Sequence, residues 1–330
     1  MGGLTLEHLL PELIIRILVN IRNLPTLSTV ARCSRTMLRL SQDPFTRAHR
    51  IPRYAREPLH WACKNTMVDN ATMRVILSTH AVDVNAKDCS GYTALIIAAM
   101  YERTELAHSL LAHAADLNVN AVDANKSRSA LHHASRSETA EVMRLLLDTK
   151  GININLQDRN GYTPLNLACF NGNTEAVSLL LGKPGVDVNV VDACGNTAMH
   201  QACRGGCLED VQLMLGSSEL DINVMTARGT PLHEALRALQ GGVEVVQELL
   251  SRQPVPDVNA TDQHGNTPLH LACQKSTNIM AKLLLGVNGI KINAVNHEGK
   301  TPLAVVRHHY ANMNWRCIEL EDLLLAVGAL

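Results

Sequence analysis

Aromatic residues are scarce in this chain of 330 residues, since Phe, Trp and Tyr together make up only 3% of it. Sandwich and barrel cores usually draw on more of them, so Leu, Ala and Val must supply the packing, which is a helical composition. An excess of one charge is also missing, because 30 Lys and Arg stand against 31 Asp and Glu. This balance gives no general argument for binding nucleic acid. Hydrophobic residues, at 46%, nevertheless suffice for a buried core.

Long apolar runs and familiar catalytic motifs are absent as well. No apolar stretch approaches about 18 residues, which excludes a membrane-spanning helix, and the first residues, MGGLTLEHLLPE, do not have the pattern of a signal peptide. The nine cysteines are an odd number, which favours reduced thiols and a place in the cytosol or the nucleus. There is no P-loop, no G-x-G-x-x-G after a strand and no H-E-x-x-H. We therefore expect no enzyme, no catalytic residue, no cofactor and no membrane contact.

What the chain does contain is an internal repeat. Eight related segments recur, namely EPLHWA, YTALIIA, SALHHA, YTPLNLA, NTAMHQA, TPLHEA, NTPLHLA and KTPLAV. Their anchor residues run from Leu59 to Leu303 at spacings of 33 to 37, and an asparagine recurs in the same phase from Asn85 to Asn293. Each unit combines a turn, a short helix, which Thr163-Pro164 opens in the fourth unit, a second apolar helix and an extended leader. Because neither helix can bury its apolar face alone, the units must stack.

These features resemble the ankyrin repeat family. The match to its T-P-L-H-x-A motif is literal in Thr267–Ala272, and its D-V-N leader occurs in Asp83–Asn85 and Asp257–Asn259. The resemblance covers residues 53–330 and implies an all-α solenoid of about eight helix-turn-helix units with fingers like β-hairpins. The predicted repeats are 53–88, 89–123, 124–158, 159–192, 193–226, 227–262, 263–296 and 297–330, the last as a C-terminal cap.

Residues 1–52 do not follow this period and form a predicted head. Leu9, Leu13 and Ile17 sit at helical spacing, and breaks at Pro11 and Pro25 suggest three short helices. Nine Arg against three acids in residues 1–56 give this part a net charge of +6, whereas the remainder carries −7. A basic head on an acidic body is a signal for a binding partner.

The head resembles an F-box, a helical hook that docks on a Skp1-type adaptor of a cullin-based, or SCF-type, ubiquitin ligase. The similarity begins at Leu10-Pro11-Glu12-Leu13, although Met37 and Phe45 stand where that family often has Trp. An F-box ahead of ankyrin repeats is an arrangement seen in filamentous fungi. The alternative is a helical cap that only covers the first repeat. If the head is an F-box, the adaptor-binding residues are Leu10, Pro11, Ile14 and Ile17.

The repeat period also accounts for most histidines and cysteines. One histidine recurs at the fourth place of the motif, where we expect its imidazole to hydrogen-bond the neighbouring turn and Thr as a structural residue. One cysteine recurs after the motif Ala, where a small apolar side chain is wanted. No metal site is therefore predicted at these positions, which are His60, His132, His200, His233 and His270, and Cys63, Cys169, Cys203 and Cys273.

Positions beside the turns and after the motif helices are not needed for packing and define a concave face. They are rich in Arg and aromatic residues, the composition of binding hot spots. We expect this face to bind a target protein that carries an acidic segment; the alternative is that finger residues such as Asp158 and Asp262 neutralise the arginines. The predicted partner-binding residues are Tyr92, Tyr101, Arg128, Arg136, Arg159, Tyr162, Phe170, Arg204 and Lys275.

Taken with the head, this face predicts a non-catalytic substrate-recognition subunit of an SCF-type ubiquitin ligase. The alternative function is a plain ankyrin scaffold or inhibitor whose head only caps the solenoid. Nucleic-acid binding is not expected, because ankyrin arrays mostly bind proteins and the body is acidic.

Overall fold

The computed structural model describes residues 59, 60, 63, 77, 83–113, 116–253, 255–275, 278–311 and 318–330. The predicted head at 1–52, with its adaptor-binding residues Leu10, Pro11, Ile14 and Ile17, lies outside the described residues. Within them the structure is helical, with isolated antiparallel bridges in two fingers and no strand. This confirms the expected all-α class. None of the helices in the described ranges is long and apolar enough to cross a membrane.

The chain divides into two compact units, Met1–Arg159 and Asn160–Leu330. In the first unit each repeat supplies an inner helix that follows the finger and an outer helix that follows the inner one. The inner helices pack on each other, as do the outer ones, and the two helices of a repeat pack together. The helices are α6 (Ala94–Met100), α7 (Thr104–His113), α8 (Ala130–Ala134) and α9 (Glu141–Leu147).

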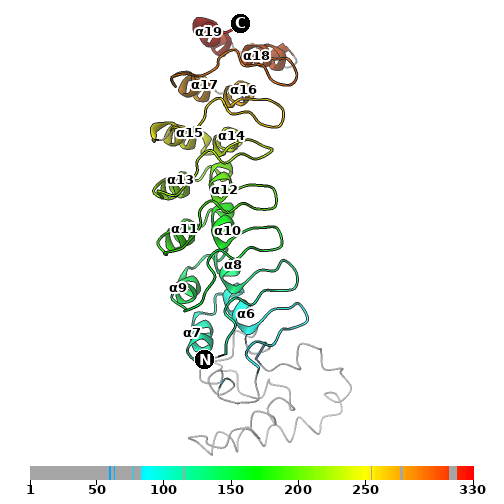
Figure 1. Cartoon of the computed structure of the whole chain (residues 1–330), viewed down its shortest axis with the longest axis vertical. Coiled ribbons are helices and arrows are strands. Elements are labelled where there is room, and N and C mark those ends of the chain that lie inside the picture. Colours follow the sequence, from blue (N-terminus) through cyan, green and yellow to red (C-terminus); the bar gives the residue numbers. More distant parts are fainter. Residues whose placement is uncertain are drawn as a thin grey trace, which may run out of the picture. The chain divides into compact units, whose positions relative to one another are not determined.

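The second unit continues the same pattern. Its inner helices stack in one row and its outer helices in a second, and the fingers project from the side of the inner row that faces away from the outer row (Figure 1). The inner helices are α10 (Pro164–Asn171), α12 (Ala198–Gly205), α14 (Pro231–Arg237), α16 (Pro268–Gln274) and α18 (Pro302–Ala311). The outer helices are α11 (Thr174–Leu181), α13 (Leu208–Leu215), α15 (Gly242–Ser251), α17 (Asn278–Leu285) and α19 (Ile318–Ala326).

A Thr or Ser precedes each of these inner helices, and in α10, α14, α16 and α18 a Pro follows it at the first helical position. In α10 the Thr163 hydroxyl accepts the amide of Asn166, and Pro164 takes a first-turn position whose amide needs no partner. The asparagines that recur in phase connect consecutive fingers. Asn189, for example, donates to the Glu219 carbonyl at 2.6 Å and accepts the Asp221 amide at 2.9 Å. The period of the sequence is thus the period of these contacts.

The motif histidines are structural, as predicted. In the second unit the Nδ1 of His200 accepts the Thr197 amide at 3.1 Å, so its Nε2 carries the proton and donates to the Gly229 carbonyl of the next finger at 3.3 Å. His233 and His270 repeat this arrangement, and in the first unit His60 bonds the Tyr92 carbonyl at 2.9 Å. Burial lowers the pKa of His200 to about 4, which keeps the ring neutral.

Two finger turns differ in length from the others, and each contains a residue with a positive φ. The longer turn before Ser129 places Ser127 at φ +56°, a left-handed conformation that glycine adopts in most other fingers. In the shorter turn Gly229 has φ +100°, and a Cβ there would collide with the ring of His233. Only glycine fits at that position.

Candidate protein-binding site

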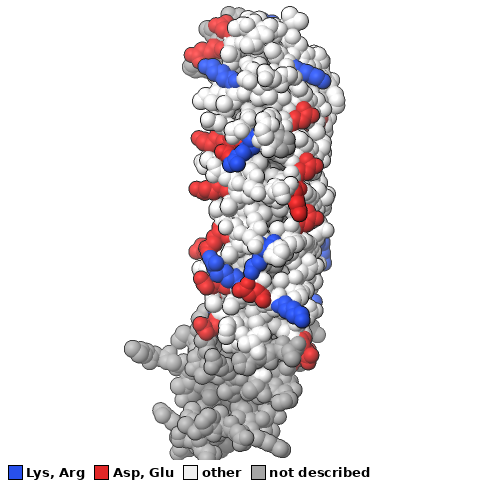
Figure 2. Space-filling view, turned by 60° about the vertical axis from the view of Figure 1, so that its left-hand side comes forward, with Lys and Arg blue, Asp and Glu red and all other residues white. Residues whose placement is uncertain are grey.

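The inner face of each unit, formed by the fingers and the C-terminal ends of the inner helices, carries the side chains that the sequence singled out. The opposite, outer-helix face shows scattered charges of both signs among uncharged side chains, with no continuous basic patch on the described residues (Figure 2). The inner face is therefore the richer candidate for recognition.

In the first unit the aromatic residues predicted for binding have different surroundings. Tyr101 follows α6 and is 54% exposed, so much of its ring is open to a partner. Tyr92 is half-buried and its ring meets His133 edge-on, with centroids 6.1 Å apart. Arg136 and Arg159 are exposed, and Arg159 donates to the Ala124 carbonyl at 3.1 Å. These side chains are accessible, at least in part, to a partner.

Arg128 requires a correction. The sequence placed it among the surface positions that are free of packing, but it is only 6% exposed and its Nε bonds Asp158 at 2.8 Å. The alternative considered above, in which finger aspartates neutralise arginines, therefore holds for this residue. The cause is a partner 30 residues away on the next finger, which no local pattern reveals.

In the second unit Tyr162 and Phe170 form an aromatic pair. Their ring centroids lie 6.3 Å apart with planes tilted by 40°, and Phe170 is 57% exposed. The pair presents apolar area that is already ordered, which suits an interface anchor. Lys275 is half-buried and donates to the Ala238 carbonyl, so its charge is partly committed to the chain itself.

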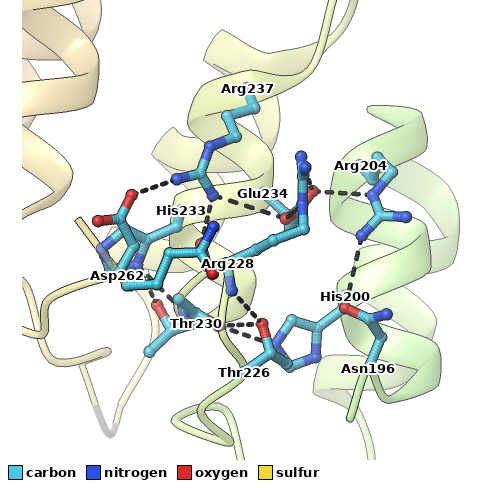
Figure 3. A network of polar contacts seen from close by, with 12 residues as sticks. Asn196, His200, Arg204, Thr226, Arg228, Thr230, His233, Glu234, Arg237 and Asp262 are labelled. Carbon is cyan, nitrogen blue, oxygen red and sulfur yellow. Dashed lines mark hydrogen bonds and ion pairs between the residues drawn. The ribbon is translucent and has the colours of Figure 1, made fainter. Parts of the chain in front are cut away.

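A cluster of arginines around Glu234 is the most developed polar arrangement of the second unit. We call it the arginine cluster, and it comprises Arg204, Arg228 and Arg237 with Glu234. Arg204 approaches from α12, Arg228 from the finger between Thr226 and Gly229, and Arg237 from α14. The three guanidinium groups converge on the carboxylate of Glu234, which also belongs to α14 (Figure 3). Arg204 Nε bonds one carboxylate oxygen at 2.8 Å and Arg228 Nε bonds the other at 2.6 Å.

The Glu234 side chain is fully buried, whereas its partners are not. The exposed fractions of the side chains are 35% for Arg204 and 52% for Arg228, against 23% for Arg237. Burial alone would raise the pKa of Glu234, but the hydrogen bonds from Arg228 and Arg204 outweigh it and lower that pKa. Glu234 is therefore ionised and acts as a fixed anchor for the guanidinium groups.

Arg237 joins the cluster to the next finger. Its Nη2 bonds Asp262 at 2.6 Å, its Nη1 lies 3.6 Å from Glu234, and it also donates to the Arg228 carbonyl. This is a second case in which a finger aspartate neutralises an arginine. Arg204 and Arg228, in contrast, keep Nη1 without a hydrogen-bond partner among the described residues.

An open cavity of about 310 Å³ adjoins the cluster on the inner face. Its lining is polar, and both Arg228 and Arg237 contribute to it. The other polar lining residues are Asp262, Gln263, His264, Asn266, Gln274 and Glu298.

The sequence marks Glu234 as unusual, because its place in the motif is uncharged in the other repeats of the unit. In three other repeats the same motif place is uncharged, at Leu167, Gln201 and Leu271, and the finger carries the acid, whereas the last repeat has Val305 and the finger residue Asn296. In this repeat the finger residue is Thr226, and the carboxylate sits on the helix instead. The acidic residue of this repeat therefore lies on the inner helix and not in the finger, which indicates that its contacts differ from those of the other repeats.

The motif cysteines are buried thiols, as expected. Burial raises the pKa of Cys273 to about 12 and that of Cys169 and Cys203 as well, so these groups are neutral and unreactive. Across the described ranges, no group of three or more His, Cys, Asp or Glu side chains is placed to hold a metal ion.

Comparison with known proteins agrees with this architecture. Family models described as ankyrin repeats match residues 33–121, 119–192, 184–262 and 249–306. The first match begins inside the segment assigned to the head. In solved structures, the ankyrin repeat domain of Bcl-3, a member of the IkappaB family, is similar with a TM-score of 0.59 and 28% identity, over 71% of this chain and 99% of that one.

Curated relatives match part of this chain. Protein glp-1 of Caenorhabditis elegans is 34% identical over 125 residues, which is 35% of this chain and 9% of that protein. Neurogenic locus notch homolog protein 1 of Mus musculus is 36% identical over 84 residues, or 26% of this chain and 3% of that protein. The chain thus spans a small fraction of the length of these relatives. Since the family models extend over most of it, the chain belongs to the ankyrin repeat family.

Proposed function

We propose that this chain is a non-catalytic protein-binding subunit that holds a target on its inner face. The observation that carries this proposal is the exposure of Tyr101 and Phe170, large aromatic side chains that leave more than half of their area open to solvent. Aromatic residues of this kind supply most of the energy of many interfaces. Family membership supports the same conclusion, because stacked repeats expose an extended surface for partners.

More specifically, we propose that the chain is the substrate-recognition subunit of an SCF-type ubiquitin ligase in the cytosol or nucleus. The head would bind a Skp1-type adaptor through Leu10, Pro11, Ile14 and Ile17, while the repeats bind the protein to be ubiquitinated. This part of the proposal depends on the F-box resemblance of residues 1–52 and on their basic charge.

A plain ankyrin scaffold or inhibitor is the second candidate. It is favoured by the ankyrin match that starts at residue 33, within the segment assigned to the head. In that case the N-terminal helices cap the first repeat and have no partner of their own.

Mixing the full chain with a purified Skp1-type adaptor on a sizing column separates the two candidates. The F-box proposal expects co-elution, and replacement of Leu10 and Pro11 by Ala should abolish it with an almost unchanged far-UV circular dichroism spectrum. A variant with Tyr101→Ala and Phe170→Ala is the matched control and should still co-elute. Failure of the unaltered chain to co-elute, or a loss of helicity in the head variant, would favour the plain scaffold.

A further inference from the structure

The arginine cluster is organised beyond what stability requires. Glu234 occupies a motif place where other repeats of the unit have the uncharged residues Leu167, Gln201 or Leu271, and a buried ion pair is often no more stable than apolar residues at such a place. What the carboxylate does provide is orientation, since it fixes Arg204 and Arg228 through their Nε atoms at 2.8 and 2.6 Å. The remaining guanidinium nitrogens are thereby held in defined directions.

These nitrogens are still available for a ligand. Nη1 of Arg204 and Nη1 of Arg228 have no hydrogen-bond partner among the described residues, and the two side chains are 35% and 52% exposed. Within the network, three guanidinium groups face the carboxylates of Glu234 and Asp262, which leaves one positive charge uncompensated. Arginines fixed in this way are suited to bind a carboxylate with two parallel hydrogen bonds.

The adjoining cavity indicates the form of the ligand. Arg228 and Arg237 line it together with neutral groups such as Gln263 and Gln274, so a peptide backbone would find donors and acceptors there. Asp262 and Glu298 also line it. A doubly charged group would be repelled by these two carboxylates, whereas a singly charged carboxylate would match the net charge of the cluster.

We propose that the arginine cluster and its cavity bind the side-chain carboxylate of an Asp or Glu in an extended acidic segment of a partner protein. This inference rests on the proposed target-binding role of the inner face, and it names the chemistry that the target must present. Glu234 is a positioning residue in this site, and Arg228 is the principal contact because it both lines the cavity and keeps a donor nitrogen without a partner.

The test uses the full chain and two short fluorescein-labelled peptides, one rich in Glu and one with every Glu replaced by Gln, with binding followed by fluorescence anisotropy. We expect the Glu peptide to bind at least about tenfold more tightly than the Gln peptide, and Arg228→Ala to weaken the Glu peptide by about tenfold. Arg252→Ala is the matched control, because Arg252 is 50% exposed and pairs with Glu248 away from the cavity. It should leave binding unchanged.

Arg228→Lys is a second variant that separates loss of binding from loss of folding, since it keeps the positive charge but removes the planar guanidinium group. It should bind the Glu peptide more weakly than the unaltered chain while keeping its melting temperature. Equal binding of both peptides, equal effects of Arg228→Ala and Arg252→Ala, or no binding of the Glu peptide would each overturn the inference. The adaptor experiment above is independent, so a chain that binds the adaptor but ignores the Glu peptide refutes only this site.

Discussion

Asp210 is a buried acid in the core, and its removal should stabilise the protein. It lies in the first turn of α13 with no exposed area, and neither carboxylate oxygen has a hydrogen-bond partner among the described residues. The other outer helices of the unit place Ala176, Val245 and Met280 at the equivalent position, all buried. The core therefore accepts an apolar side chain where this repeat has a carboxyl group.

The expected magnitude follows from two opposing contributions. A buried polar group without partners costs about 1–3 kcal/mol, while an acid in the first turn of a helix gains about 0.3–1 kcal/mol from the helix dipole. Asp210→Ala should therefore raise the free energy of unfolding by about 1–2 kcal/mol near neutral pH. Asp210→Asn should gain less, because the charge is removed but the buried amide still lacks partners.

The gain should also depend on pH in a defined direction. Burial raises the pKa of Asp210. The nearby Thr174 hydroxyl and Cys207 thiol offset only part of that shift, because neither makes a hydrogen bond of full geometry with the carboxylate. Below the ordinary pKa of an Asp, about 4, the group is protonated in both states and costs little. As the pH rises toward the higher pKa of the folded state, the unfolded chain loses the Asp210 proton more readily than the folded chain does. The free energy of unfolding therefore falls.

Urea unfolding followed by circular dichroism at pH 4 and pH 7 measures this directly. The advantage of Asp210→Ala over the unaltered chain should be larger at pH 7. Glu209→Ala is the control, because Glu209 occupies the same helical turn but is exposed, and it should lower stability slightly. The reasoning is refuted if Asp210→Ala is destabilising, or if its advantage is the same at both pH values.

Three further predictions concern the turns and the motif. Asn166→His should stabilise the chain by about 1 kcal/mol in urea unfolding. The NH2 group of the Asn166 side chain is buried without a partner among the described residues, whereas a His at this motif place would donate to the Asn196 carbonyl, as His200 does to Gly229. A loss of stability would contradict this. Mild acid should weaken folding between pH 6.5 and about 4, by up to about 3 kcal/mol for His200 alone, because its pKa is lowered to about 4 in the fold and the unfolded chain takes up protons first; His200→Asn should flatten this pH profile. Ser127→Gly should raise the melting temperature through relief of its positive φ, worth about 1 kcal/mol, whereas Gly229→Ala should lower it sharply.

Much of the fold could be predicted because the sequence motifs and the packing contacts recur with the same period. In units that carry it, the motif His, for example His200 or His270, bonds a carbonyl of the next finger that lies 29 to 33 residues further along the chain, and the motif Cys, for example Cys203, is buried. Positions that obey the period therefore have the same role in each repeat, and one repeat explains the others.

Positions that break the period were decided by the tertiary structure alone. Arg128 and Arg136 are both arginines that flank α8, but Arg128 is buried against Asp158 while Arg136 is exposed. Glu234 gathers arginines from two repeats, and Asp210 is buried where its equivalents are apolar. Arg128 and Arg204 are each held by an acid 30 residues away, and such a pair is only formed when the units stack. The sequence determines which helices stack, whereas stacking determines which charges meet.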